Sequence, residues 1–283
     1  MEYAISKADL HNDLLAETLQ ALSECFGAIG AEVYVVGASA RDIALRLLKV
    51  EDTPRRTLDL DVAVALKEWS QYDRLSHVMQ RNCFEKDRAK QRFTYLGKDG
   101  RNRFEVDVVP FGDIEENGLV AWPPEGSPVM SVRGFSDVMA HADGVDVEGA
   151  FSFRLASLSG QFLIKLDAWG DRHFRTRKDV ADMVYIMQNV YVAYALSSKE
   201  MPEEVGMDAS NFDVVVAGTE WIAADLKGML SDANRRYYAD MLRKELDKAE
   251  ESQLINDMLD ASDSRNYALF RRALSRMSEI LMP

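Results

Sequence analysis

The segment 56–64, Arg-Thr-Leu-Asp-Leu-Asp-Val-Ala-Val, constrains more than any other what this chain can fold into. Its apolar residues alternate with the others, which is the period of a β-strand, because successive side chains of a strand point to opposite faces. Asp59 and Asp61 are therefore predicted to project from one face, about 7 Å apart at the backbone. Two carboxylates this close stay ionised at low cost only where cations lie between them. Oxygen ligands at this spacing suit Mg²⁺ far better than Zn²⁺; the alternative interpretation is a solvated strand edge.

A small-residue turn precedes this strand. The run 33–36, Val-Tyr-Val-Val, is typical of a buried strand, and helical spacing of apolar residues returns after Ala40. Between them, the small side chains of Gly37, Ala38 and Ser39 would let backbone N–H groups approach a ligand, and the start of a helix favours negative charge. The turn is thus a candidate phosphate site; the alternative is a plain connection between a strand and a helix.

A third carboxylate follows downstream. Segments 92–96 and 103–109 are predicted to form a hairpin closed by a turn that contains Gly100. In the second strand the residues of even number are apolar and share one face, whereas Glu105 and Asp107 lie on the other. Asp107 is therefore an acidic residue in an otherwise apolar segment, and it joins the candidate site; the alternative is an acid that faces water.

The rest of the chain indicates an α/β (α+β) fold, with a small mixed, twisted sheet flanked by helices and followed by a helical C-terminal domain. Helical spacing is found at 6–30 and 69–81, the Pro- and Gly-rich segment 118–132 indicates a loop, a short helix is expected at 135–142, and 151–155 indicates a last strand. After Ser157 only helical patterns follow. We therefore expect one domain at 1–156 and a second at 157–283.

Charge and composition exclude several classes of protein. The net charge of −13 argues against a dedicated binder of long nucleic acid such as double-stranded DNA. No run approaches the roughly 20 apolar residues that span a bilayer, so no membrane partner is expected. The first nine residues lack the features of a signal peptide, and two cysteines cannot make a disulfide framework. We expect a cytoplasmic protein.

The order of these motifs resembles the polymerase-β-like nucleotidyltransferase superfamily, whose pattern is a Gly-[Gly]-Ser turn, an Asp-x-Asp pair and a third carboxylate on an adjacent strand. The run 56–61, Arg-Thr-Leu-Asp-Leu-Asp, is similar to the Arg-x-Thr/Ser-x-Asp-Ile-Asp variant of the AbiEii-type and minimal nucleotidyltransferases. The resemblance covers about residues 33–186. One departure is Ala38, which stands where the second glycine usually lies and brings a methyl group close to the expected phosphate position.

The resemblance implies a role for each residue of the turn and strands. A nucleoside monophosphate would pass from an NTP to an acceptor hydroxyl with loss of pyrophosphate. Asp59 and Asp61 would hold the metal ion on the triphosphate and share a second ion, which Asp107 would complete; both are expected to be Mg²⁺, with Mn²⁺ as a substitute. Gly37, Ala38 and Ser39 would hold the β- and γ-phosphates.

A further match lies in the helical part. The segments 165–172 and 177–182 are similar to the family's Lys-x-x-Ala-x-x-x-Arg and Lys-Asp-x-x-Asp helices. Lys165 and Arg172 are seven residues apart, so they share a helix face, and the resemblance implies that they line the nucleotide cleft and neutralise the triphosphate. Asp179 and Asp182 are expected to orient cationic side chains. The alternative for all four is a solvated, ion-paired helix surface.

The acceptor stays open at this stage. Members of the family modify tRNA, protein or small molecules, and some act as toxins of toxin–antitoxin or phage-defence systems, which adds a cognate antitoxin to the expected partners. Arg41 and Asp42 resemble instead the motif of tRNA CCA-adding enzymes, a second assignment. A third is a non-catalytic module that binds nucleotide or a partner protein on the same fold, and a hydrolytic enzyme is a fourth.

Overall fold

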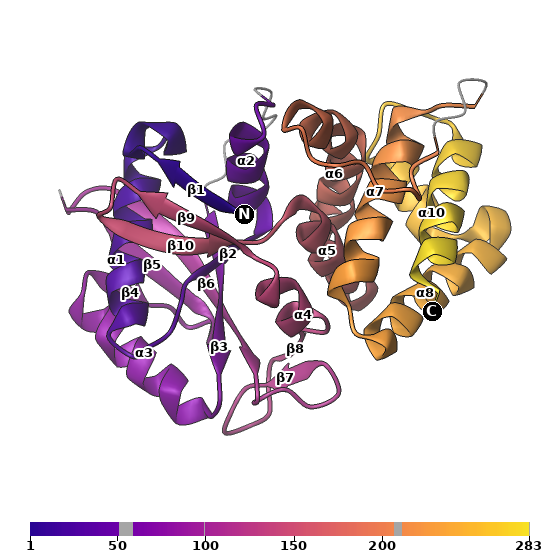
Figure 1. Ribbon diagram of the computed structural model, residues 1–283. Coiled ribbons are helices and arrows are strands. Elements are labelled where there is room, and N and C mark those ends of the chain that lie inside the picture. Colours follow the sequence, from indigo (N-terminus) through magenta and orange to yellow (C-terminus); the bar gives the residue numbers. More distant parts are fainter. Residues whose placement is uncertain (51–58, 99, 207–210, 283) are drawn as a thin grey trace. The chain divides into compact units, whose positions relative to one another are not determined.

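The computed structural model describes residues 1–50, 59–98, 100–206 and 211–282 (Figure 1). The predicted site residues all lie among them, whereas Arg56, Thr57 and Leu58 of the strand motif lie outside. The chain divides into two compact units, Met1–Ala44 with Asp52–Ser157 and Leu45–Glu51 with Leu158–Pro283. Each unit is described by itself.

The first unit is built on one large mixed sheet. In the described part of the chain it has eight strands in the order β1-β9-β10-β2-β3-β6-β5-β4. The strands are β1 (Glu2–Ile5), β2 (Tyr34–Val36), β3 (Asp59–Leu66), β4 (Phe84–Lys86), β5 (Arg92–Leu96), β6 (Arg103–Gly112), β9 (Asp143–Val147) and β10 (Phe151–Leu155). The pairs β1–β9, β10–β2 and β3–β6 are parallel and the others antiparallel. The prediction of a mixed α/β fold is confirmed, but the sheet is larger than the small one expected.

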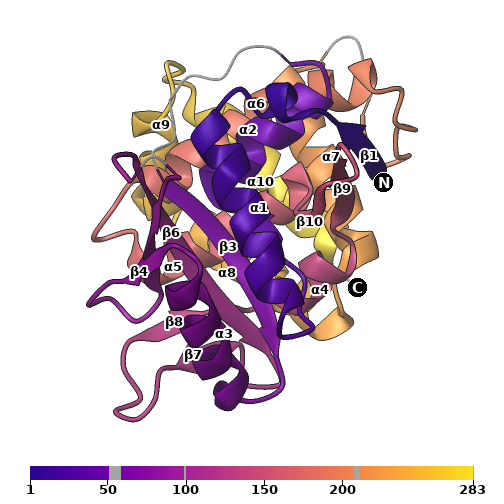
Figure 2. The same cartoon turned by 90° about the vertical axis from the view of Figure 1, so that its left-hand side faces the viewer.

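Two helices cover one face of this sheet. Helices α1 (Asp13–Gly27) and α3 (Trp69–Arg81) lie in front of β3 and β6 in Figure 2, and they pack against β10, β6 and β3. Along β3, and along β6 as far as Pro110, the residues of even number are buried, among them Leu60, Val62 and Val106. This burial of apolar side chains on one face leaves the odd-numbered residues of the two strands on the other.

Two local predictions, the helix over 6–30 and the loop over 118–132, were wrong, and some strands were missed. The helix expected at 6–30 begins only at Asp13, because the Asn12 side chain accepts a hydrogen bond from the Leu15 N–H at 3.2 Å and caps it. Strands β1 and β9 were missed because one is a short edge strand and the other is rich in Asp and Gly. The segment 118–132 contains a hairpin, β7 (Leu119–Ala121) and β8 (Val129–Ser131), whose strands lie on either side of its prolines.

The remaining elements of the first unit are α2 (Gly37–Leu47) and α4 (Phe135–Ala140). Helix α2 starts directly after β2, so the expected turn is the first turn of the helix itself. Helix α4 packs on β6, where the rings of Phe135 and Phe111 lie 5.9 Å apart. The turn, the Asp-x-Asp strand and the third carboxylate therefore come from three consecutive strands of the sheet, β2, β3 and β6.

The described part of the second unit is helical. Its helices are α5 (Leu158–Arg172), α6 (Lys178–Leu196), α7 (Val214–Met229), α8 (Asp232–Asp247), α9 (Gln253–Asp260) and α10 (Tyr267–Leu281). Helix α7 packs against α5, α6 and α10 and places Trp221 in the core. Its start is fixed by Asp213, whose side chain accepts the N–H of Val215 at 2.8 Å. None of the described helices combines the length and the apolar character that crossing a membrane requires.

Candidate functional site

Four carboxylates share the face of the sheet opposite to the one that α1 and α3 cover. In the parallel pairing of β3 with β6, Asp61 lies opposite Asp107 and Asp59 opposite Glu105. Residues opposite each other in register project from the same face, so the three predicted carboxylates and Glu105 form one acidic surface, here called the carboxylate face. Sequence reasoning did not include Glu105 in the site, although its spacing of two from Asp107 was the signal that places it there.

Gly37 lies against the Asp61 side chain at the point where α2 begins. Its φ is +72°, in the left-handed region that glycine enters without a Cβ clash. A Cβ on this residue would lie 2.2 Å from Oδ2 of Asp61 and 2.9 Å from its Cβ and Cγ. Glycine is therefore required here for two reasons, its backbone conformation and the space that the Asp61 carboxylate occupies.

Ser39 ties the start of α2 to the start of β3. Its side chain is buried and its hydroxyl donates a hydrogen bond to the backbone oxygen of Asp59 at 3.0 Å. Ala38 lies in the first turn of α2, whose helical backbone accepts an alanine without strain. These contacts fix where Asp59 stands relative to the helix start. That Gly37, Ala38 and Ser39 hold phosphate stays a prediction.

Arg92 of β5 holds Asp107. Its Nε donates to Oδ1 of Asp107 at 2.8 Å and its Nη2 to Oδ2 at 2.9 Å, a bidentate ion pair. The third nitrogen, Nη1, lies 3.1 Å from Oε2 of Glu105. The hydrogen bonds to Asp107 raise the pKa of the Arg92 guanidinium, which keeps its charge throughout. One cation therefore serves two of the four carboxylates.

The donors of the carboxylate face suit a hard divalent cation, because Asp59, Asp61 and Asp107 offer only oxygen. The glycine at position 37, which leaves the Asp61 carboxylate its space, fits the same use. Within the described residues, however, no three His, Cys, Asp or Glu side chains are grouped closely enough to hold a metal ion. The bidentate pair with Arg92 engages both oxygens of Asp107, so a metal ion at Asp107 would share these oxygens with the guanidinium or displace it.

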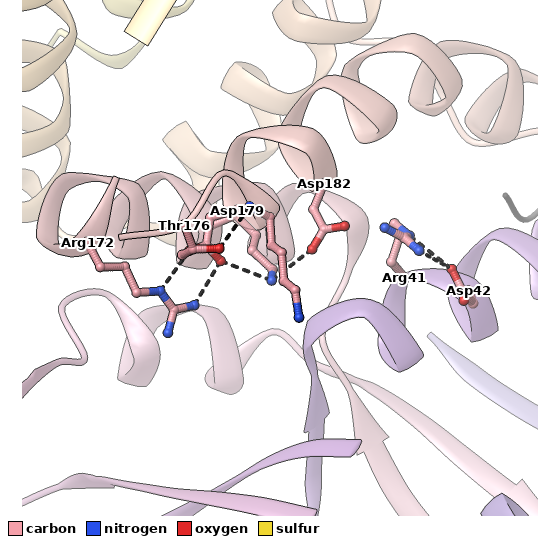
Figure 3. Close-up of polar contacts among 8 residues, drawn as sticks. Arg41, Asp42, Arg172, Thr176, Asp179 and Asp182 are labelled. Atoms are coloured by element: carbon pink, nitrogen blue, oxygen red, sulfur yellow. Dashed lines mark hydrogen bonds and ion pairs between the residues drawn. The ribbon is translucent and has the colours of Figure 1, made fainter. Parts of the chain in front are cut away.

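Lys165 and Arg172 converge on one buried carboxylate of the second unit, Asp179. Figure 3 shows Arg172 beside Asp179. Arg172 donates from Nε to Oδ2 of Asp179 at 2.7 Å and from Nη2 to Oδ1 at 2.9 Å. The ammonium of Lys165 lies 3.2 Å from Oδ1 of Asp179 and 2.8 Å from Oδ2 of Asp182. Burial acts to raise the pKa of Asp179, but the two cations outweigh it and leave the pKa below its usual value.

This network gives Asp179 and Asp182 the orienting contacts that were expected of them. The Asp179 side chain is 1% exposed, and that of Arg172 is 47% exposed, so the guanidinium also reaches solvent. A contact of Lys165 or Arg172 with a triphosphate stays a prediction. Arg41 and Asp42 form a buried ion pair, Nη2 to Oδ1 at 2.7 Å (Figure 3).

A separate pocket lies in the second unit. It has a volume of about 660 Å³ and is lined by residues of α5 and α8 and by residues that directly follow these helices, including Trp169, His173, Tyr237 and Met241. The rings of Trp169 and His173 are stacked, 4.6 Å apart. The predicted site residues, all of which the structure describes, do not line this pocket.

Neither the known protein-family models nor the curated proteins compared with this chain gave a match.

Proposed function

We propose that this protein is a metal-dependent nucleotidyltransferase, which moves a nucleoside monophosphate from an NTP to the hydroxyl of an acceptor. The observation that carries the proposal is the register of β3 with β6, which sets Asp61 opposite Asp107 on the face that also holds Asp59. The start of α2 at Gly37, packed against Asp61, supports it, because a helix N-terminus favours a phosphate group.

In the proposed reaction the acceptor oxygen attacks the α-phosphorus, the new O–P bond forms, and the bond to the β-phosphate oxygen breaks to release pyrophosphate. Two Mg²⁺ ions, when bound, stabilise negative charge on the attacking and leaving oxygens. Asp59 and Asp61 hold the triphosphate side of the site. Asp107 lies beside Asp61 and receives the proton of the acceptor hydroxyl. The amides of 37–39 would hold the terminal phosphates, and the resemblance assigns Lys165 and Arg172 to neutralising triphosphate charge.

We propose as the acceptor one of the classes that the motif resemblance implies, which are tRNA, a protein or a small molecule. A toxin with a cognate antitoxin in the cytoplasm is the biological setting that the motif resemblance implies. The resemblance also implies a catalytic domain, 1–156, followed by a helical domain, 157–283.

The test is incubation with each α-³²P-labelled NTP, Mg²⁺, and total cellular RNA and protein. We expect label to appear on a discrete band with the wild type and to be lost with Asp61→Asn. Asp73→Asn, the same chemical change at an exposed position of α3, is the matched control and should keep the activity. Undiminished labelling by Asp61→Asn would rule out the proposed site.

One observation favours a second candidate, a non-catalytic module that binds nucleotide. Arg92 engages both oxygens of Asp107, and a protein without turnover has no need of a free third carboxylate. The two candidates differ in the same experiment, because a binding module would retain labelled NTP in equilibrium dialysis and transfer no label to any acceptor.

A further inference from the structure

The pocket between α5 and α8 has no part in the proposed function. Its volume of about 660 Å³ lies in the range of small-molecule sites. Its walls come from the last turn of α5, from α8 beyond Tyr237 and from the residue after each helix, so it lies within one compact unit. Gly170 lets the two helices approach each other, because a Cβ on it would lie 2.8 Å from Cε of Met241. The pocket is thus a product of how these two helices pack.

Hydrogen bonds fix an aromatic wall on the α5 side of the pocket. The indole of Trp169 donates from Nε1 to Oδ2 of Asp257 at 2.9 Å, and the His173 ring stacks on it with the ring centres 4.6 Å apart. Nδ1 of His173 lies 2.9 Å from the backbone oxygen of Trp169. A carbonyl oxygen only accepts, so Nδ1 carries the hydrogen and Nε2 of the neutral ring is an acceptor. Both rings are therefore in place before a ligand arrives, which reduces the entropy lost on binding.

The charges around the pocket favour a cation. Three carboxylates and two ammonium groups line it, those of Asp240, Glu245, Asp247, Lys244 and Lys248. One of the ammonium groups, that of Lys248, is already paired with Glu245. The last turns of both α5 and α8 also line the pocket, and the last carbonyl groups of a helix carry partial negative charge. A positive group in the pocket would therefore be attracted by the side chains and by both helix ends.

We propose that this pocket binds an organic cation, an ammonium group on a flat apolar body. The body packs against Trp169, His173 and Met241, and ring faces of this kind also attract cations. The ammonium lies in the field of Asp240 and Asp247, which are seven residues apart and so share one face of α8. Arg243 is 3.6 Å from Asp240 and 49% exposed, a weak contact that the ligand can replace.

The proposal is independent of nucleotidyl transfer, because the pocket and the carboxylate face have no described residue in common. Its test therefore needs neither nucleotide nor metal. Three probes share a phenyl ring and differ in charge near neutral pH: 2-phenylethylamine is a cation, 2-phenylethanol is neutral and 3-phenylpropionate is an anion. Their binding to the whole chain is followed by ligand-observed NMR titration at about 0.15 M salt, where distant surface charges are largely screened.

We expect the amine to bind about tenfold more tightly than the alcohol, as a cation–ring contact and two partly exposed ion pairs together would give. The propionate should bind most weakly of the three. Equal affinities for the three probes, tighter binding of the propionate, or no measurable binding of the amine would each overturn the proposal.

The double variant Asp240→Asn/Asp247→Asn locates the ammonium group. It should lower the affinity for the amine about tenfold and leave that for the alcohol within about twofold of the wild type. Asp232→Asn/Asp263→Asn is the matched control, because it removes the same number of charges at exposed positions of the same unit that do not line the pocket. An equal loss of affinity in the two double variants would assign the effect to overall charge and refute the site.

His173→Ala locates the apolar body. It removes half of the aromatic wall, so the affinities for the amine and the alcohol should both fall about three- to tenfold. His141→Ala is the control, because Nδ1 of His141 makes the same kind of contact, 2.9 Å from the backbone oxygen four residues earlier, in the other unit. Unchanged affinity for the alcohol in His173→Ala, or the same loss in His141→Ala, would place the probes elsewhere and overturn the proposal.

Discussion

Replacement of Gly37 by alanine tests how the helix start and the Asp61 carboxylate depend on each other. The new Cβ would lie 2.2 Å from Oδ2 of Asp61 and 2.9 Å from its Cβ and Cγ. Oδ2 can rotate away, but the Cβ of Asp61 is fixed by its strand. The alanine would also have to adopt a φ near +72°. The substitution therefore combines a backbone penalty with a steric one, and both act on a predicted metal ligand.

A second glycine of the same unit separates the two penalties. Gly30 has the same φ of +72°, and a Cβ there would meet nothing within 4 Å. Gly30→Ala should therefore cost only the left-handed conformation, about 1–2 kcal/mol of the free energy of unfolding. Gly37→Ala should cost that amount and about 1–3 kcal/mol more for the overpacking against Asp61.

The chain has two units, so a single melting temperature is a poor measure of this difference. Hydrogen exchange in urea, followed in peptides from β3, reports on the first unit alone. Asp61→Gly in the Gly37→Ala background removes every side-chain atom that the new methyl would meet, and a double-mutant cycle should recover most of the extra cost. A cost of Gly37→Ala no greater than that of Gly30→Ala would refute the packing argument.

Two further predictions concern charge. Burial lowers the pKa of Lys86 to about 8, while Asp87 and Asp107 act against the shift. The folded protein then binds fewer protons than the unfolded chain between that pKa and the ordinary 10.5, so this group makes stability rise with pH across the window. Lys86→Met should remove this rise in the free energy of unfolding, which we expect to be about 1–2 kcal/mol after allowance for partial exposure. Urea denaturation of both proteins at pH 7.5 and 10 measures it, and the same pH dependence in Lys86→Met as in the wild type would contradict the prediction. Asp179→Asn should destabilise the second unit by about 2–4 kcal/mol because it leaves Lys165 and Arg172 without their shared buried partner. Hydrogen exchange in peptides from α5 and α6 measures this loss of stability, and Asp171→Asn, at an exposed position, is the control. An equal loss of stability in the two variants would contradict the role of the network.

The alternation of apolar and polar residues predicted two central strands of the first unit. Alternation at 59–64 and 103–109 predicted two strands, each with an acidic and an apolar side, and the structure has Asp59 and Asp61 in β3 and Asp107 in β6. Such patterns succeed where one face is buried, because burial is what selects the alternation. Strand β9, Asp-Gly-Val-Asp-Val, has no comparable contrast, and it was missed. The size of the sheet could not be predicted, because edge strands bury little and leave little trace in the sequence.

Helical spacing located most helices but not their partners. The seven-residue interval between Lys165 and Arg172 predicts a common face, whereas their convergence on Asp179 depends on how α5 and α6 pack. Asp179 is 1% exposed, a position that a charged residue reaches only when cations meet it there. A sequence gives the spacing within a helix directly, but the packing of two helices depends on many side chains together.

The register of β5 with β6 determines that Arg92 pairs with Asp107 at the carboxylate face. Leu96 pairs with Arg103 across the turn, and each step back along β5 is matched by a step forward along β6, which brings Arg92 opposite Asp107. The strand limits expected from the sequence, 92–96 and 103–109, already imply this pairing if the turn has six residues. A slip of one residue would turn Arg92 to the apolar face. The counter-ion of Asp107 thus depends on the length of one turn, whereas the acidic residues are recognised from their motif alone.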